Sequence, residues 1–347
     1  MAHSLPNEWD VLDASGMKQL VERWPTDWRE AWDLAAPVEN WPLVQPDAIV
    51  VLGMGGSAIG GDLMRAFVAP TSRVPVYVNR SYTVPAFVGP NTLVIVSSYS
   101  GNTEETLNAF RQARGREAQA VCITSGGQLL EEATKADLPH LKIPGGRPPR
   151  AALAFSLAPL LRLSNALGLA SIEPAHVDET VGILSALTAQ YKTGTAHLAF
   201  DIARRLAGQL PVVYTAPDLL ETVGVRWRGQ MQENGKSPAY GNVFPELNHN
   251  EIVGWEHGLM GQMTVVVLRD QNDHPRVLRR IDVTRGLVSE RAADWIEVES
   301  MGESRMARLL SMICLGDWVS LYLALHNGAD PTPIPLIDAL KDTLSRS

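Results

Sequence analysis

Cysteine is scarce in this sequence of 347 residues, which contains only Cys122 and Cys314. Both lie in apolar segments, so we expect two buried, unpaired thiols, which suit the reducing cytoplasm. The eight histidines are scattered and form neither an H-E-x-x-H motif nor a cluster with cysteine. The sequence therefore offers no metal site.

Positive charge and long apolar runs are also limited. Lysine and arginine number 30 against 38 aspartates and glutamates, giving a net charge of −8 without a long basic run, so we expect no nucleic-acid partner. The most apolar stretch, residues 151–170, is interrupted by Pro159 and Arg162 and predicts a buried helix, not a membrane span. Residues 1–13 lack the basic flank and apolar run of a signal peptide.

The apolar fraction of 45% is enough for sizeable cores, and the length corresponds to about two domains. Between residues 48 and 143, strand patterns alternate with helical ones. The predicted strands are 48–52, 74–78, 93–97, 120–124 and 138–143, and the predicted helices are 60–67, 104–114 and 129–136. This alternation predicts a doubly wound parallel sheet with helices on both faces and ligands at the carboxyl ends of its strands.

A Gly-Gly-Arg-Pro-Pro segment at residues 145–149 breaks this pattern. After a helical stretch, a second alternating block has predicted strands at 211–215, 264–268 and 296–299 and ends in helices at 304–326 and 336–344. We therefore predict an α/β protein of four parts: a tryptophan-rich arm (1–46), a first domain (47–150), a helical connection (151–209), and a second domain with C-terminal helices (210–347). The two similar halves suggest an internal duplication.

The N-terminal arm contains Trp24, Trp28 and Trp32 at positions i, i+4 and i+8, which lie on one helical face. Such a face could be a platform on which a sugar stacks. Its spacing favours a simpler interpretation, an apolar face that docks on the main body.

Two stretches about forty residues apart are the most informative, residues 50–62 and 94–106. Each reads as a buried strand, a loop of glycine, serine or threonine, and the start of a helix. This arrangement gathers backbone N–H groups and hydroxyls at a helix N-terminus, where a phosphate is stabilised. The hydroxyl residues are Ser57, Ser98, Ser100 and Thr103. Each could be a simple helix cap, but three hydroxyls within six residues exceed what capping needs.

The first stretch, with Gly53-x-Gly55-Gly56, also resembles a dinucleotide fingerprint, a weak signal alone. A dinucleotide fold places an acidic residue after its second strand, whereas this chain has Asn79-Arg80 there. A monophosphate is therefore favoured over NAD, with NADP bound through Arg80 as a remote option.

Residues 232–251 are dense in groups that perform acid–base chemistry, and a long loop of this kind is either functional or disordered. Within it, Glu246 and Glu251 could be caps or surface charges. Asp317, in an apolar helix, is expected to be a hydrogen-bonded buried acid. Arg150 could be a paired surface arginine or a positive charge directed into a cleft.

These residues together resemble a known family. The two loops are similar to those of sugar isomerase (SIS) domains, which bind phosphosugars. Three further stretches resemble bifunctional phosphoglucose/phosphomannose isomerases: residues 233–237 with 245–251, residues 315–324, and residues 330–333 with the closing Leu340-Lys341. The resemblance extends from about residue 48 to the C-terminus and implies two SIS-type doubly wound domains.

The resemblance implies a role for each candidate residue. Ser57, Ser98, Ser100 and Thr103 would bind the substrate phosphate, with the Gly56 N–H close by. Glu233 would shuttle a proton between C1 and C2, and Arg150 would stabilise the enediolate. His249 and Lys341 would assist ring opening, with His249 contributed by the second subunit of a homodimer. Such a reaction needs neither a redox cofactor nor, in this branch, a metal.

Two other functions remain open. A non-catalytic SIS regulator would keep the serine loop and could lose Glu233, His249 and Lys341, yet all three are present. An isomerase of another sugar phosphate, such as an amino sugar or a pentose phosphate, is disfavoured through the resemblance alone.

Overall fold

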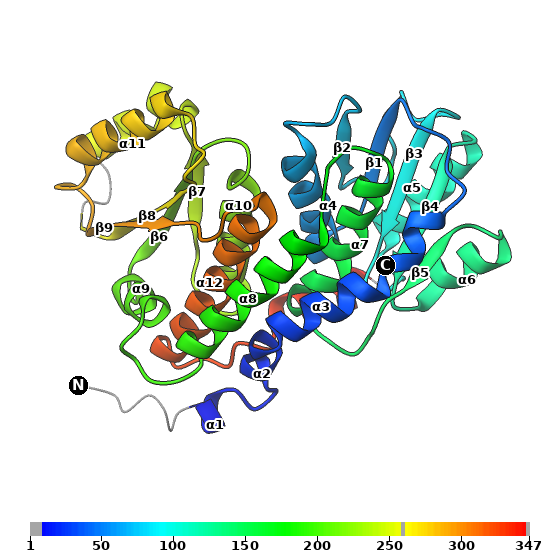
Figure 1. The fold of residues 1–347 in the computed structure, drawn as a ribbon. Helices are drawn as coiled ribbons and strands as arrows, with labels where there is room; N and C mark the ends of the chain where they lie inside the picture. Colours follow the sequence, from blue (N-terminus) through cyan, green and yellow to red (C-terminus); the bar gives the residue numbers. More distant parts are fainter. Residues whose placement is uncertain (1–8, 258–260, 345–347) are drawn as a thin grey trace. The chain divides into compact units, whose positions relative to one another are not determined.

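A computed structural model of the chain describes residues 9–257 and 261–344. The chain divides into two compact units (Figure 1). The first, here the N-terminal unit, comprises Trp24–Ile183 and Gly302–Ala307. The second, the C-terminal unit, comprises the described residues of the ranges 9–23, 184–301 and 308–344.

The N-terminal unit is built on a five-stranded parallel sheet with the order β2-β1-β3-β4-β5. Its strands are β1 (Ala48–Leu52), β2 (Val76–Asn79), β3 (Thr92–Ser97), β4 (Gln119–Thr124) and β5 (His140–Lys142). Its helical segments are α3 (Trp24–Leu34), η2 (Ala36–Asn40), α4 (Gly55–Val68), α5 (Glu104–Gly115), α6 (Gly127–Lys135), η3 (Pro149–Ala151) and α7 (Leu153–Ala166). The predicted doubly wound sheet is therefore confirmed.

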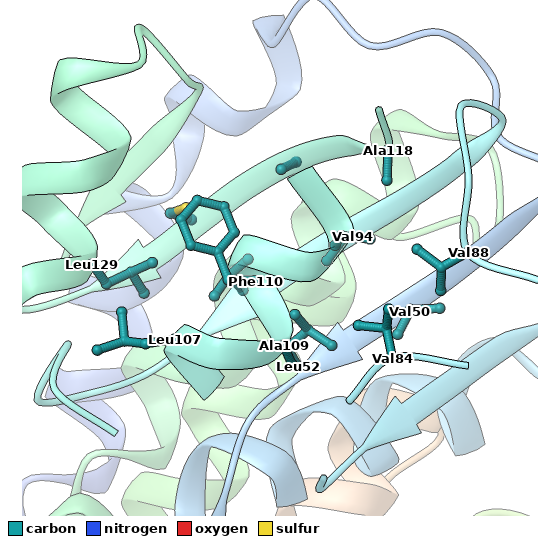
Figure 2. Packing of buried hydrophobic residues seen from close by; sticks show 14 of the residues in the cluster. Val50, Leu52, Val84, Val88, Val94, Leu107, Ala109, Phe110, Ala118 and Leu129 are labelled. Carbon is teal, nitrogen blue, oxygen red and sulfur yellow. The ribbon is translucent and has the colours of Figure 1, made fainter. Parts of the chain in front are cut away.

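One face of this sheet packs on α5, and Figure 2 shows the resulting core. Alternate residues of a strand point to the same face, so Val50 and Leu52 of β1 and Val94 of β3 lie in one cluster. Leu107 and Phe110, one turn apart on α5, pack into it. Nearly every residue of β1 and β3 is buried, as the sequence predicts for these two strands.

The tryptophan-rich arm forms α3, which packs on α7. Trp28 is completely buried, and Trp24 and Trp32 are nearly so. The guanidinium of Arg162 on α7 lies 4.8 Å from the centre of the Trp32 ring, a cation–π contact. The docking interpretation is therefore confirmed, and these three side chains offer no open face to a sugar.

The C-terminal unit contains a four-stranded parallel sheet with the order β7-β6-β8-β9. Its strands are β6 (Leu210–Thr215), β7 (Tyr240–Val243), β8 (Met263–Arg269) and β9 (Asp294–Glu299). Its other elements are α1 (Trp9–Leu12), α2 (Met17–Glu22), α9 (Leu198–Leu206), α10 (Glu221–Glu233), η4 (Glu246–His249), η5 (Glu251–Glu256), α11 (Pro275–Val288) and α13 (Pro335–Leu344). The two longest helices, α8 (Pro174–Tyr191) and α12 (Arg305–His326), each have residues in both units.

Two of the differences from the prediction are informative. Helix α4 begins at Gly55, five residues before the predicted start, and its glycines let it pack closely on its neighbours. A Cβ at Gly61, for example, would lie 2.8 Å from a methyl carbon of Val51. Strand β7 was not predicted, because Tyr240-Gly-Asn-Val is short and polar and Tyr240 is exposed at the edge of its sheet.

Among the described residues one helix, α12, is long and apolar enough to cross a membrane by length and composition. However, 94% of its most apolar window is buried inside the structure, as in the core helix of a globular protein. Cys314 lies in this helix, and both it and Cys122 are buried free thiols, as expected. Burial raises the pKa of Cys122 to about 12, so this group is a neutral thiol at pH 7.

Candidate active site

The loops that follow β1 and β3 begin side by side at the carboxyl edge of the first sheet. The two strands are neighbours, with Leu52 opposite Val96. We call residues 53–57 the first loop and residues 98–103 the serine loop. In the strand order 2-1-3-4-5, the chain leaves β1 toward one edge of the sheet and leaves β3 toward the other edge. The place between β1 and β3 where this direction reverses is the topological switch point, and ligands of doubly wound sheets bind there. The predicted neighbouring arrangement of the two loops is therefore confirmed.

The first loop leads into the N-terminus of α4 without a capping side chain. Gly53 must lack a side chain, because a Cβ there would lie 2.9 Å from the backbone oxygen of Ser97. Gly55 has φ +48°, a left-handed conformation that glycine adopts without strain. The first-turn N–H groups of α4, which include that of Gly56, can therefore donate to an anion.

The serine loop presents hydroxyl groups that do not cap α5. Thr103 precedes this helix, but its side chain makes no capping hydrogen bond, so the cap interpretation is wrong for Thr103. Its Oγ1 lies 3.1 Å from Ser98 Oγ, which accepts the Gly101 N–H at 3.2 Å. The exposed Ser100 Oγ accepts the Asn102 N–H at 3.2 Å. Since a hydroxyl that accepts one bond still has its own hydrogen, Ser100 can donate to a phosphate oxygen.

A third segment, which the sequence analysis did not include, supports these two loops. Ser57 Oγ accepts the Tyr99 N–H at 3.2 Å and so joins the first loop to the serine loop. Ser125, after β4, donates to the backbone oxygen of Tyr99 through its N–H at 3.1 Å and its Oγ at 2.6 Å. Gly127 has φ +69°, and a Cβ there would lie 2.5 Å from the backbone oxygen of Ser100. The Thr-Ser-Gly-Gly run after the fourth strand was the sequence signal for this segment.

Arg150 lies in the short turn η3, against the first loop. A Cβ at Gly56 would lie 3.0 Å from the backbone oxygen of Pro149 and 3.6 Å from the backbone nitrogen of Arg150. Only 5% of the Arg150 surface is exposed, so the surface interpretation is wrong. The N-terminal unit therefore brings together six predicted site residues: Gly56, Ser57, Ser98, Ser100, Thr103 and Arg150.

Arg80, considered for an NADP phosphate, follows β2 and forms an ion pair with Asp62 of α4. The preceding Asn79 is buried and donates to the backbone oxygen of Ser81 at 3.1 Å. These contacts give both residues structural partners at the end of β2.

In the C-terminal unit, Glu233 is the last residue of α10 and is half-buried. Residues 234–236, which follow it and which we call the Glu233 segment, are hydrogen-bonded to α12 and to the turn that follows α12. Asn234 Nδ2 donates to Ser320 Oγ at 3.0 Å, and Asn327 Nδ2 donates to the backbone oxygen of Gly235 at 2.7 Å. The Nζ of Lys236 donates to the backbone oxygens of Pro331 and Pro333 at 3.2 and 2.6 Å. Three of the stretches that carried the resemblance therefore meet in space.

Asp317 of α12 holds α10 in the two turns that precede Glu233. Arg226 Nη2 donates to its two carboxylate oxygens at 2.9 and 2.7 Å, and Gln230 Nε2 donates at 2.8 Å. All three side chains are buried. The expectation of a hydrogen-bonded buried acid is confirmed, and the group holds the end of the helix that presents Glu233.

Glu246 and Glu251, the two other glutamates of the stretch 232–251, have structural partners. Glu251 accepts from Tyr214 Oη at 2.5 Å and from Asn242 Nδ2 at 2.7 Å, which holds η5 on strands β6 and β7. Glu246 is exposed and accepts from Asn250 Nδ2 at 2.9 Å within the same loop. Both carboxylates therefore hold parts of the C-terminal unit together.

His249 and Lys341 lie on other elements of the C-terminal unit. His249 is exposed at the end of η4, and Lys341 is exposed on α13. Spacing alone would not have selected Lys341.

Comparison with known proteins extends these observations. Residues 43–145 match the family model of the SIS domain, and residues 196–344 match that of the bacterial phospho-glucose isomerase C-terminal SIS domain. A curated protein of Caldicellulosiruptor bescii, named bifunctional phosphoglucose/phosphomannose isomerase, is 44% identical over 95% of this chain and 99% of its own length. A protein of the same name from Aquifex aeolicus is 38% identical over 86% of this chain and 90% of its own.

Solved structures agree on the fold. The C-terminal domain of glucosamine-fructose-6-phosphate aminotransferase from Francisella tularensis superimposes with a TM-score of 0.69 over 91% of this chain and 98% of its own, at 14% identity. At this identity the likeness concerns the fold alone, two SIS-type domains. The full-length sequence relatives go further, and by them this chain belongs to the family of bifunctional phosphoglucose/phosphomannose isomerases and is a phosphosugar isomerase.

Proposed function

We propose that this enzyme interconverts both glucose 6-phosphate and mannose 6-phosphate with fructose 6-phosphate through a shared cis-enediol. The observation that carries the proposal is the joined first loop and serine loop at the β1/β3 switch point. Its N–H and hydroxyl donors suit a phosphate monoester. The names of the full-length relatives support the pair of substrates.

The phosphate is bound by the Gly56 N–H and by the hydroxyls of Ser57, Ser98, Ser100 and Thr103. Each hydrogen bond to a charged group contributes about 1.5–3 kcal/mol. Because the phosphate does not react, these bonds act in the ground state and the transition state alike. Their role is to orient the open sugar chain.

The chemistry is a proton transfer between two neighbouring carbons. Glu233 removes the proton from C2 of the aldose and returns it to C1, and Arg150 stabilises the negative charge that develops on the enediolate oxygen. His249 and Lys341 open the sugar ring before this step. The aldose and the ketose are isomers, so no electron acceptor is consumed and no cofactor is needed.

We further propose that the enzyme acts in the cytoplasm as a homodimer in which His249 serves the partner's site. The exposed position of His249 on η4 supports this arrangement. The exposed apolar side chains of α13, Leu336, Leu340 and Leu344, are a further surface that a second copy would cover. The two buried free thiols support the compartment.

The substrate pair is tested by proton NMR of the purified protein with each of the three hexose 6-phosphates. We expect the signals of the other two to appear from any one of them, because both aldoses give the same enediol. If mannose 6-phosphate stays unchanged while glucose 6-phosphate turns over, the dual specificity is wrong.

The shared site is tested by mixing two inactive variants, Glu233→Gln and His249→Ala, under conditions of subunit exchange. A shared site predicts partial recovery, because one of the two sites in a mixed dimer then has both groups intact. Absence of recovery, with exchange verified by mass spectrometry, would contradict the shared site.

A further inference from the structure

We propose that Asp27 of the tryptophan-rich arm and Arg147 form a positioning pair that fixes the turn carrying Arg150. The inference rests on the proposed function, in which Arg150 stabilises the enediolate. It assigns the arm a role in the reaction beyond covering α7.

The pair is geometrically specific. Arg147 donates to both carboxylate oxygens of Asp27, through Nη1 to Oδ2 and through Nη2 to Oδ1, the second at 3.1 Å. The side chain of Asp27 is 4% exposed and that of Arg147 is 14% exposed. A bidentate bond between planar groups fixes orientation as well as distance.

Arg147 is also held from two other directions. Its guanidinium carbon lies 5.1 Å from the centre of the Phe155 ring on α7. Its backbone N–H donates to Tyr99 Oη at 3.2 Å, and Tyr99 lies between Ser98 and Ser100 in the serine loop. One residue therefore connects the arm, α7 and the serine loop.

The link from Arg147 to Arg150 is short and stiff. Pro148 and Pro149 separate the two residues, and each proline ring fixes its own φ. The turn is closed by the Ala151 N–H, which donates to the backbone oxygen of Pro148 at 2.9 Å. A displacement of Arg147 therefore moves Arg150 by a similar amount.

Docking of the arm does not by itself require this pair. Trp24, Trp28 and Trp32 already bury an apolar face on the body of the unit. Removing two charges from water offsets much of their mutual attraction, so a buried ion pair adds little to stability over an apolar contact. What such a pair supplies is a defined geometry, here at the segment that leads into Arg150.

A kinetic cycle of Asp27→Asn, Arg150→Ala and the double variant tests the inference. Asn keeps the shape of Asp27 and removes its charge. We expect kcat to fall about ten- to a hundred-fold, as for a group misplaced by about 1 Å, with KM for fructose 6-phosphate nearly unchanged because the serine hydroxyls are untouched. In the Arg150→Ala background, Asp27→Asn should lower kcat no further.

The matched control is Asp178→Asn, which removes another aspartate–arginine pair of the arm, that with Arg29. It should keep the wild-type kcat. Wild-type kcat in Asp27→Asn, or the same loss with and without Arg150, would overturn the inference. An Arg150→Ala variant with normal kcat would instead contradict the proposed role of Arg150.

If Asp27→Asn does not fold, Tyr99→Phe tests the same linkage. This change removes only the hydroxyl that accepts the Arg147 N–H, and Tyr99 is nearly buried. We expect a several-fold loss of kcat that disappears in the Arg150→Ala background. A loss that persists there would contradict a role through Arg150.

Discussion

The two units share the order of their first four strands but differ at the point where a ligand would bind. In the N-terminal unit, the loops after β1 and β3 contain glycines and hydroxyls and present hydrogen-bond donors to an anion. In the C-terminal unit, the corresponding loops after β6 and β8 contain Asp218, Asp270 and Asp273. The architecture is repeated, whereas the binding chemistry is not.

The acidic loops are explained by contacts within their own unit. Asp270 accepts from Arg308 Nε at 2.9 Å and from Ser300 Oγ at 2.8 Å, and is nearly buried. Burial and the nearby charge of Asp270 raise the pKa of Asp273 to about 6. Carboxylates at this point repel a phosphate, so the fold supplies the location and the side chains decide its use.

The largest effect is expected for Asp270→Asn. The change removes the carboxylate charge that pairs with the buried Arg308, and breaking such a pair costs about 3–5 kcal/mol in the free energy of unfolding. KM of the folded protein should not change if this switch point binds no substrate. Urea denaturation measures the loss, and Asp282→Asn, at an exposed residue, is the control. A large rise in KM would place substrate at the acidic loops and contradict the comparison.

Ser100→Ala tests the other side of the comparison. Loss of one hydrogen bond to a phosphate should raise KM for fructose 6-phosphate about ten- to a hundred-fold with the fold intact. Steady-state kinetics measure this, and Ser72→Ala, in the turn after α4, is the control. An unchanged KM would remove Ser100 from the binding site.

The smallest effect concerns Asp273 and pH. Because its folded-state pKa is raised, the native state binds more protons than the unfolded chain between the ordinary pKa of 3.8 and about 6. Its contribution to stability is therefore present below about pH 3.8 and lost as the pH rises through 6. Asp273→Asn should be more stable than the wild type at pH 7 and equally stable near pH 4. Urea titrations across this range would contradict the assignment if the difference did not change.

The sequence predicted the parts of the fold and site that are encoded locally. A strand, a glycine or serine loop and a helix are consecutive in the chain, so the first loop and the serine loop were visible in the pattern of residues. Their adjacency followed from the rule that ligands bind at strand ends in a doubly wound sheet. The early start of α4 was missed because tertiary packing overrides the low helix propensity of glycine.

The other half of the site depends on contacts between distant residues. Asp317 meets Arg226 across 91 positions, and Asp27 meets Arg147 across 120. No local pattern encodes such pairs, so Glu233 and Arg150 were given roles through resemblance to a family. The supporting contacts became visible only in the structure.

The most direct test of the proposed division between binding and chemistry is proton exchange by Glu233→Gln. This variant keeps the shape of the side chain and removes the base, while the serine loop is untouched. In deuterated water, we expect the wild type to exchange the C2 proton of glucose 6-phosphate and the variant to show only background exchange, with the same Kd for the sugar phosphate. Exchange at the wild-type rate in Glu233→Gln would show that another group is the base and would contradict the account.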